Sequence, residues 1–293
     1  MTSVGIGILL SIVAMLSWGF GDFLIQKNTR KIGNWETLFF ITFFGAVVLL
    51  PFCFREVIAV LSDLGNGGMT LLIACVTLFI AAIVDFEALR QGKLAVIEPV
   101  WSFEIPVTSA LAFFILGEKV TVLELILVAL LVVFLILVSF NQNRFSKKFL
   151  LEKGVVLAFV GALFMGSANF FVGWGARLTD PVTINFIVDA FLMLICLAVL
   201  LFRGNYKKTV SDMKNNLGTL LPMSIADKVA WLAFAGAMVL APIAISTALS
   251  QSYIIIAVIL GMTINKEKLY RHQWLGMFGA IATAIALALI TSH

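Results

Sequence analysis

Two glutamates, Glu98 and Glu104, lie within one apolar stretch of the chain, where an ionised side chain is costly unless it has a role. Each stands three residues from Trp101, so on a helix the three side chains would span an arc of about 120°. Pro99 and Pro106 each remove a backbone donor and therefore bend or open the helix. Acidic and aromatic groups beside a broken helix can bind a solute inside a membrane, so this stretch is a candidate binding site. The alternative is a proline kink for packing, with both glutamates paired to Lys or Arg elsewhere.

Two aspartates also lie deep within apolar stretches. Asp227 is about 15 Å and Asp189 about 12 Å along its helix, too far for a carboxylate to reach the interface. We therefore expect both to face protein or a water-filled cavity, as we do for Glu104. Lys228 leaves one alternative open, because its pairing with Glu104 or Asp189 would make the deep charges structural rather than functional.

Aromatic and amide side chains complete the predicted site. Trp18 and Asp22, four residues apart, share one face of the first apolar stretch. In the second half of the chain, Asn169 stands at the position that repeats Asp22. Gln251 and Tyr253 lie in the stretch that repeats the proline-containing one. The first half is therefore expected to present acidic and aromatic groups, and the second half neutral hydrogen-bonding groups.

The rest of the chain determines how these side chains are positioned. Of the 293 residues, 61% are apolar and only 12% are charged, and the mean hydropathy is +1.09. A soluble domain would need about a quarter of its residues charged. Because backbone groups in hydrocarbon must pair within their own segment, we predict an all-α membrane protein with ten transmembrane helices. The predicted spans are 3–25, 35–54, 69–90, 94–116, 121–140, 153–175, 181–202, 217–237, 240–263 and 272–291.

Several function classes are excluded by what lies between the spans. The connections are short, so none can hold a soluble catalytic or nucleic-acid-binding domain, and the net charge of +4 lies in loops. The three cysteines fall inside apolar spans without the spacing of a metal site. No phosphate-binding Gly-x-x-x-x-Gly-Lys loop is present, so ATP does not drive the protein. We predict no cofactor and no metal.

The distribution of basic residues predicts an orientation. Of the 20 Lys and Arg residues, all but four lie in or beside the odd-numbered connections. By the positive-inside rule those connections are cytoplasmic, and both termini are outside. The four exceptions are Arg55, Lys119, Arg177 and Lys228.

The chain also repeats itself at a spacing of about 149 residues. Residues 116–119, which precede one apolar span, correspond to residues 264–268, which precede the last. Two tandem units of five helices, an odd number, must enter the membrane in opposite directions, which makes them inverted repeats. The predicted boundaries are 1–141 for the first five-helix repeat, 142–152 for a linker loop and 153–293 for the second repeat.

These features resemble the drug/metabolite transporter superfamily, and within it the EamA type with two repeats. The resemblance rests on ten spans, on Trp18-Gly19, on Gly117-Glu118-Lys119 and on Pro106 twelve residues before Glu118. It covers essentially the whole chain, although Ile255 stands where Pro106 would repeat. It implies export of metabolites or amino acids more often than uptake. It also implies cytoplasmic termini, whereas the Lys and Arg count places them outside.

The leading hypothesis is a secondary transporter that moves a small organic metabolite by alternating access, with efflux expected. Deep carboxylates can gain and lose protons as water access alternates, which would permit proton coupling, and they would suit a cationic substrate. A channel or a lipid scramblase is the alternative, and a channel would show neither saturation nor counterflow. Gly19-Phe20-Gly21-Asp22 reads GxGD, the motif of intramembrane aspartyl proteases, but the Tyr-Asp and Pro-Ala-Leu elements of that family are absent. We therefore predict that the protein is not an enzyme.

The expected partners are a small-molecule substrate and the lipid bilayer. No nucleic acid is expected, and no oligomer is required. The expected location is the cell membrane, plasma or inner, which the chain crosses many times.

Overall fold

The computed structural model describes residues 2–62, 65–91, 100–139, 153–204, 206–256 and 270–291, and all regular structure in these ranges is helical. The elements are α1 (Ser3–Ile32), α2 (Asn34–Ser62), α3 (Gly65–Gln91), α5 (Glu104–Leu116), α6 (Val122–Ser139), α8 (Lys153–Leu178), α9 (Pro181–Phe202), α10 (Tyr206–Asn215), α11 (Leu217–Leu240), α12 (Ile243–Ser250) and α14 (Arg271–Thr291).

The helices match the predicted spans. Within the described ranges, α1, α2, α3, α8, α9, α11 and α14 are long and apolar enough to cross a membrane. Three shorter apolar helices cover 104–116, 122–138 and 243–256, where the remaining spans were predicted. The prediction of an all-α membrane fold is confirmed.

One helix was not predicted. We expected residues 203–216 to form a polar connection, but α10 lies there. Its Thr209, Val210 and Met213 share one face, while lysines occupy the other, as in helices that lie along a membrane interface. A search by mean hydropathy misses such a helix because its apolar and polar faces cancel in the average.

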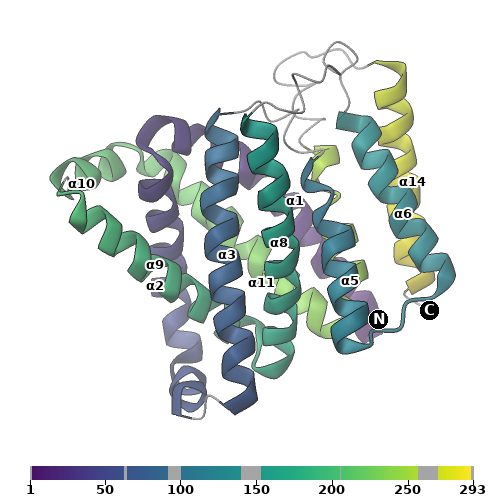
Figure 1. The fold of residues 1–293 in the computed structure, drawn as a ribbon, viewed down its shortest axis with the longest axis horizontal. Helices are drawn as coiled ribbons and strands as arrows, with labels where there is room; N and C mark the ends of the chain where they lie inside the picture. Colours follow the sequence, from purple (N-terminus) through teal and green to yellow (C-terminus); the bar gives the residue numbers. More distant parts are fainter. Residues whose placement is uncertain are drawn as a thin grey trace.

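The two halves of the chain pack reciprocally. The helix α3 packs mainly against α8, and α1, the counterpart of α8, packs mainly against α11, the counterpart of α3. The remaining extensive contacts join α2 to its counterpart α9, and α6 to its counterpart α14. Figure 1 shows α6 and α14 side by side and running in opposite directions. This exchange of partners is the pattern expected of two inverted units related by a two-fold axis.

The chain begins and ends at the same side of the bundle. The start of α1 and the end of α14 lie at the lower right in Figure 1, and we call this side the terminal edge. The opposite edge is where α1 and α3 end and where α8 and α11 begin.

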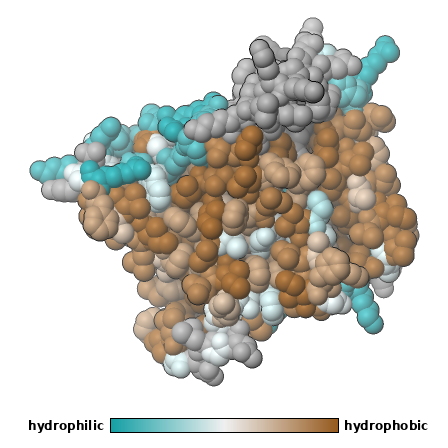
Figure 2. Space-filling model, viewed as in Figure 1, coloured by the Kyte–Doolittle hydropathy of each residue, from teal (hydrophilic) through white to brown (hydrophobic). Residues whose placement is uncertain are grey.

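Small side chains lie between the helices and large apolar ones lie outside. Ala14, Ala162 and Ala235 are fully buried, whereas the side chain of Phe114 is 80% exposed. Figure 2 shows a broad hydrophobic belt across the middle of the molecule, with hydrophilic side chains along the upper side over α10. Small residues let helix backbones approach closely in lipid, where large apolar side chains gain nothing from burial. The distribution fits a bundle surrounded by hydrocarbon.

A helix break occurs at equivalent places in the two halves. The first is the turn at Ser102 and Phe103, immediately before α5, and the second is the turn at Gln251 and Ser252, after α12. In the first, Pro106 has no N–H to bond the carbonyl of Ser102, which accepts from the N–H of Ile105 instead, at 3.3 Å.

The second break has no proline, and a serine accounts for it. The Ser252 hydroxyl donates to the carbonyl of Ala248 at 3.1 Å, the acceptor that its own backbone N–H would use in a regular α-helix. That N–H turns to the carbonyl of Leu249 instead, at 3.2 Å. Prolines signalled only the first break because a serine in mid-helix is usually compatible with a continuous helix.

Candidate functional site

A cavity of about 120 Å³ lies between the two halves of the chain. Its walls come from α1, α2 and α3, from the break before α5, from α8, α9 and α11, and from the break after α12. Glu98, a predicted site residue, lies outside the described residues. The other nine predicted site residues all line the cavity: Trp18, Asp22, Trp101, Glu104, Asn169, Asp189, Asp227, Gln251 and Tyr253.

Glu104 is held by amides from the opposite half. Its side chain is only 3% exposed, and it begins α5 directly after the first helix break. Oε2 accepts from Nδ2 of Asn169 on α8 at 3.1 Å and from Nε2 of Gln251 in the second break at 2.7 Å. Within the described residues it has no basic partner. The alternative pairing of Glu104 with Lys228 is therefore not the one that forms.

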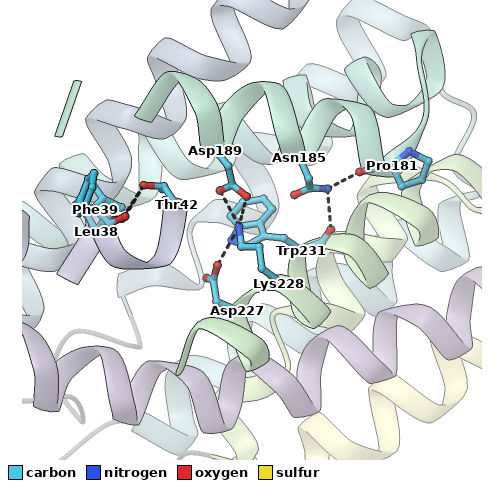
Figure 3. Close-up of polar contacts among 9 residues, drawn as sticks. All are labelled: Leu38, Phe39, Thr42, Pro181, Asn185, Asp189, Asp227, Lys228 and Trp231. Atoms are coloured by element: carbon cyan, nitrogen blue, oxygen red, sulfur yellow. Dashed lines mark hydrogen bonds and ion pairs between the residues drawn. The ribbon is translucent and has the colours of Figure 1, made fainter. Parts of the chain in front are cut away.

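Lys228 instead lies between two aspartates (Figure 3). Its Nζ donates to Oδ1 and Oδ2 of Asp189 on α9 at 2.7 and 2.8 Å, and it lies 3.2 Å from Oδ2 of Asp227. All three side chains are buried. A Cβ at Gly45 of α2 would overlap Oδ2 of Asp189, so this pair packs directly on a bare stretch of helix backbone. The alternative of a structural ion pair thus holds for Asp189, Asp227 and Lys228.

Asp85 is a cavity residue that the sequence argument did not select. It is buried, and its Oδ1 accepts from the indole Nε1 of Trp101 at 3.0 Å. A Cβ at Gly161 of α8 would overlap the same oxygen, so Asp85 is enclosed from a third helix. Asp85 lies six residues from the end of α3, so its position along the helix alone would place it close to the membrane interface. Depth along a helix does not show that Trp101, before a break in another helix, reaches over to cover it.

Aromatic rings form the wall around Asp22. Trp18 packs edge-on against Trp231 and Phe234, with ring centroids 5.3 and 5.0 Å apart, and against Tyr253 at 6.4 Å. Tyr253 is also a hydrogen-bonding neighbour of Asp22. The two residues come from different halves of the chain.

The cavity carries a large excess of acidic groups. Its described lining holds the five carboxylates Asp22, Asp85, Glu104, Asp189 and Asp227, and a single basic residue, Lys228. Since Lys228 is bound by two of them, the other three carboxylates have no cationic partner among the described residues. Asn185 and Trp231 also line the cavity and were not among the predicted site residues, although each lies four residues from a predicted aspartate, on the same helix face.

A polar cluster closes the fold at the terminal edge. Arg177, near the end of α8, donates to Oε1 of Glu118 at 2.7 Å and to the carbonyl oxygens of Met238 and Ala241 at 2.7 and 3.0 Å. Glu118 in turn accepts from the backbone N–H of Ile243 at the start of α12, at 2.9 Å. A carboxylate is favoured there by the helix dipole. We call Glu118, Arg177 and this helix start the end cluster, and it ties the first half to the second.

The cavity extends away from the terminal edge. Its lining includes Leu89, two residues before α3 ends, and Leu38, four residues after α2 begins. Both positions belong to the opposite edge, where the basic residues Arg30, Arg90 and Lys207 also lie. The cavity therefore extends from the middle of the bundle towards that edge and away from the end cluster.

Comparison with known proteins agrees with this architecture. The model of the EamA-like transporter family matches residues 5–140 and again residues 152–289. An uncharacterized transporter of Archaeoglobus fulgidus is 23% identical over 207 residues, which are 71% of each chain. A protein of known crystal structure, 14% identical, superimposes with a TM-score of 0.70 over 98% of this chain and 97% of its own, which shows the shared fold.

Proposed function

This chain belongs to the EamA-like transporter family and is a multi-pass membrane transporter, and we propose that it exports a small organic metabolite by alternating access. The observation that carries the proposal is the cavity between two reciprocally packed halves, which is lined by carboxylates to which the described part of the chain supplies no cation. One copy of the chain suffices, because both walls come from the same chain.

The inverted relation of the halves supports alternating access. In the state described here, the end cluster joins α5, α8, α11 and α12 at the terminal edge, and the cavity extends to the opposite edge. If the halves exchanged conformations, the same contacts would close the opposite edge and open the terminal one. The breaks in the fourth helix of each half, at Ser102 and at Gln251, are suitable hinges for that exchange.

The direction and the coupling follow from charge. By the positive-inside rule we propose that the opposite edge is cytoplasmic and that the termini are external, so the cavity described here would load from the cytoplasm of a cell membrane. A carboxylate enclosed without a cation either takes up a proton or holds a cationic solute. Glu104, Asp85 and Asp22 would exchange these partners as access alternates, which couples export to proton entry.

Proteolysis is not part of the proposal. Asp22, Asp85 and Asp227 all line the cavity. The other sequence elements of the aspartyl protease family are absent, however, and the family of this chain is a transporter family.

The test begins without any assumption about the substrate. Cells that produce the protein, or its Glu104→Gln variant, are compared by untargeted mass spectrometry of the medium. Each solute enriched by the unchanged protein is then measured in proteoliposomes for saturation, counterflow and response to an imposed pH gradient. We expect saturable counterflow that Glu104→Gln reduces at least ten-fold. Flux that neither saturates nor exchanges would indicate a channel, and lipid transfer alone a scramblase; either result refutes the proposal.

A further inference from the structure

Most of the donor groups that line the cavity are already engaged by the protein. Apart from the indole of Trp18, for which the described residues give no bond, each donor group makes at least one bond to an acceptor of the protein itself. The amides of Asn169 and Gln251 both donate to Glu104. The indole of Trp101 donates to Asp85 and that of Trp231 to Asp227, Tyr253 bonds Asp22, and Lys228 donates to both Asp189 and Asp227. Asn185 donates to two backbone carbonyls and Thr42 donates to the carbonyl of Leu38.

Several acceptors, in contrast, are left over. Both amide bonds to Glu104 end on Oε2, so Oε1 receives none from the described residues. The same holds for Oδ2 of Asp85, whose Trp101 partner bonds Oδ1. Oε1 of Gln251 is buried and has no hydrogen-bond partner among the described residues. It is assigned as the oxygen because the other end of the amide donates to the carboxylate of Glu104.

Of these three atoms, Oε1 of Gln251 is the one that the structure gives as fully buried, and a buried acceptor without a donor costs about 1–3 kcal/mol. A ligand that supplies N–H groups would satisfy these atoms, whereas a ligand with only acceptors would add to their number. Asp85 and Asp22 are acidic neighbours of Glu104, so carboxyl groups are concentrated in one part of the cavity. An anionic ligand would meet these groups with the single lysine of the lining already bound by two aspartates.

The aromatic lining points to the same class of ligand. Trp18, Trp101 and Trp231 line the cavity beside the carboxylates, together with Tyr253. The faces of such rings attract a positive charge, and tryptophan does so most strongly. The apolar remainder of the wall, from Ile25, Leu38 and Leu78 among others, would accommodate an alkyl chain.

From this placement, and resting on the proposed function, we infer that the substrate is a small organic cation with N–H donors, a primary alkylammonium compound. Its ammonium group binds between Glu104 and Asp85, with Oε1 of Gln251 as a neutral acceptor and the tryptophan rings around it. Quaternary ammonium compounds have the charge without the donors and bind more weakly. Uncharged amides have donors without the charge, and carboxylates have neither.

The inference is tested by binding to the purified full-length protein. Thermal unfolding, followed by tryptophan fluorescence, is titrated with four probes of similar size: n-butylammonium, tetramethylammonium, butyramide and butyrate. A ligand that binds the folded state raises the unfolding midpoint in a concentration-dependent manner. We expect n-butylammonium to bind at least ten-fold more tightly than tetramethylammonium and butyramide, and butyrate to give no saturable shift.

The variants Glu104→Gln and Asp85→Asn test the location. Each should weaken n-butylammonium binding at least ten-fold, while Glu56→Gln, at an exposed position of α2, should leave it unchanged. A variant is assessed only if its own unfolding remains cooperative, and two variants in different helices guard against the loss of one. Equal affinity in all three variants overturns the inference, as does stronger binding of butyrate or butyramide, or no shift with any ammonium probe.

Proteoliposomes separate this inference from the proposed function. Binding of n-butylammonium without counterflow would keep the ligand class and refute transport of that class. Saturable counterflow of an anionic or uncharged solute, with no ammonium binding, would keep the transporter and overturn the ligand class.

Discussion

Replacing Lys228 by methionine removes the only cation from a buried group of three charges. The methionine side chain has a similar length and can occupy the space of the lysine stem. Asp189 and Asp227 would then face one another without the ammonium group that lies 2.7 and 3.2 Å from them. Removal of one partner from a buried ion pair costs about 3–5 kcal/mol, because it leaves an uncompensated charge.

The size of the effect can be stated for a melting experiment. With about 2 °C per kcal/mol for a chain of this length, the unfolding midpoint of Lys228→Met should fall by about 6–10 °C. The assay is heat unfolding of the detergent-purified protein, followed by tryptophan fluorescence. Lys119→Met is the matched control, because Lys119 is exposed and its replacement should stay within about 0.5 kcal/mol.

A neutral variant distinguishes charge from packing. Asp189→Asn, Asp227→Asn and Lys228→Met combined leave no charge in the group and nearly the same volume. Replacement of a whole buried ion pair is often neutral, so this triple variant should regain at least half of the lost stability. The reasoning is refuted if Lys228→Met costs less than about 1 kcal/mol, or if the triple variant is less stable than the single one.

Three further outcomes are expected. Gly45→Ala pushes a methyl group into Asp189 and should lower the unfolding midpoint by the equivalent of about 1–3 kcal/mol. Gly218→Ala is the control and should leave the midpoint unchanged, because the space around its Cβ is open. Equal midpoints for the two variants would contradict the described packing of Asp189 on α2. Trp101→Phe leaves Asp85 without its hydrogen-bond donor and should lower the free energy of unfolding by about 1–3 kcal/mol. Trp274→Phe, at a position that is 39% exposed, should lower it little. A larger fall in the unfolding midpoint for Trp274→Phe than for Trp101→Phe would contradict this prediction. Arg177→Ala breaks the end cluster, so a cysteine placed at Asn169 should become more accessible from the side of the termini. Its reaction with an impermeant thiol reagent added on that side should be at least ten-fold faster, because each 1.4 kcal/mol of closing free energy that is lost corresponds to about ten-fold. An unchanged rate would show that the cluster does not close that edge.

The sequence was sufficient to locate the apolar helices, although not α10, because hydrocarbon imposes a local rule. A segment that crosses a membrane must be apolar and must satisfy its own backbone, so each span can be read from its own residues. The same rule made Glu104, Asp189 and Asp227 conspicuous, since carboxylates at that depth need an enclosed environment. Prolines marked the first helix break for an equally local reason, the missing N–H of Pro106.

Partners were a different matter, because a pairing depends on two helices that are distant in the chain. Nothing near Lys228 in the sequence distinguishes Asp189, 39 residues away, from Glu104, and only the packing of α9 against α11 decides between them. Asp85 became a cavity residue only when Trp101 reached it from another helix. The donors on Glu104 come from the opposite half, 65 and 147 residues away. How deep a carboxylate lies in the membrane is thus fixed by its position along one helix, whereas the cation that neutralises it comes from another helix of the assembled bundle. Which of the described carboxylates pair with Lys228 was therefore decided by the tertiary structure alone.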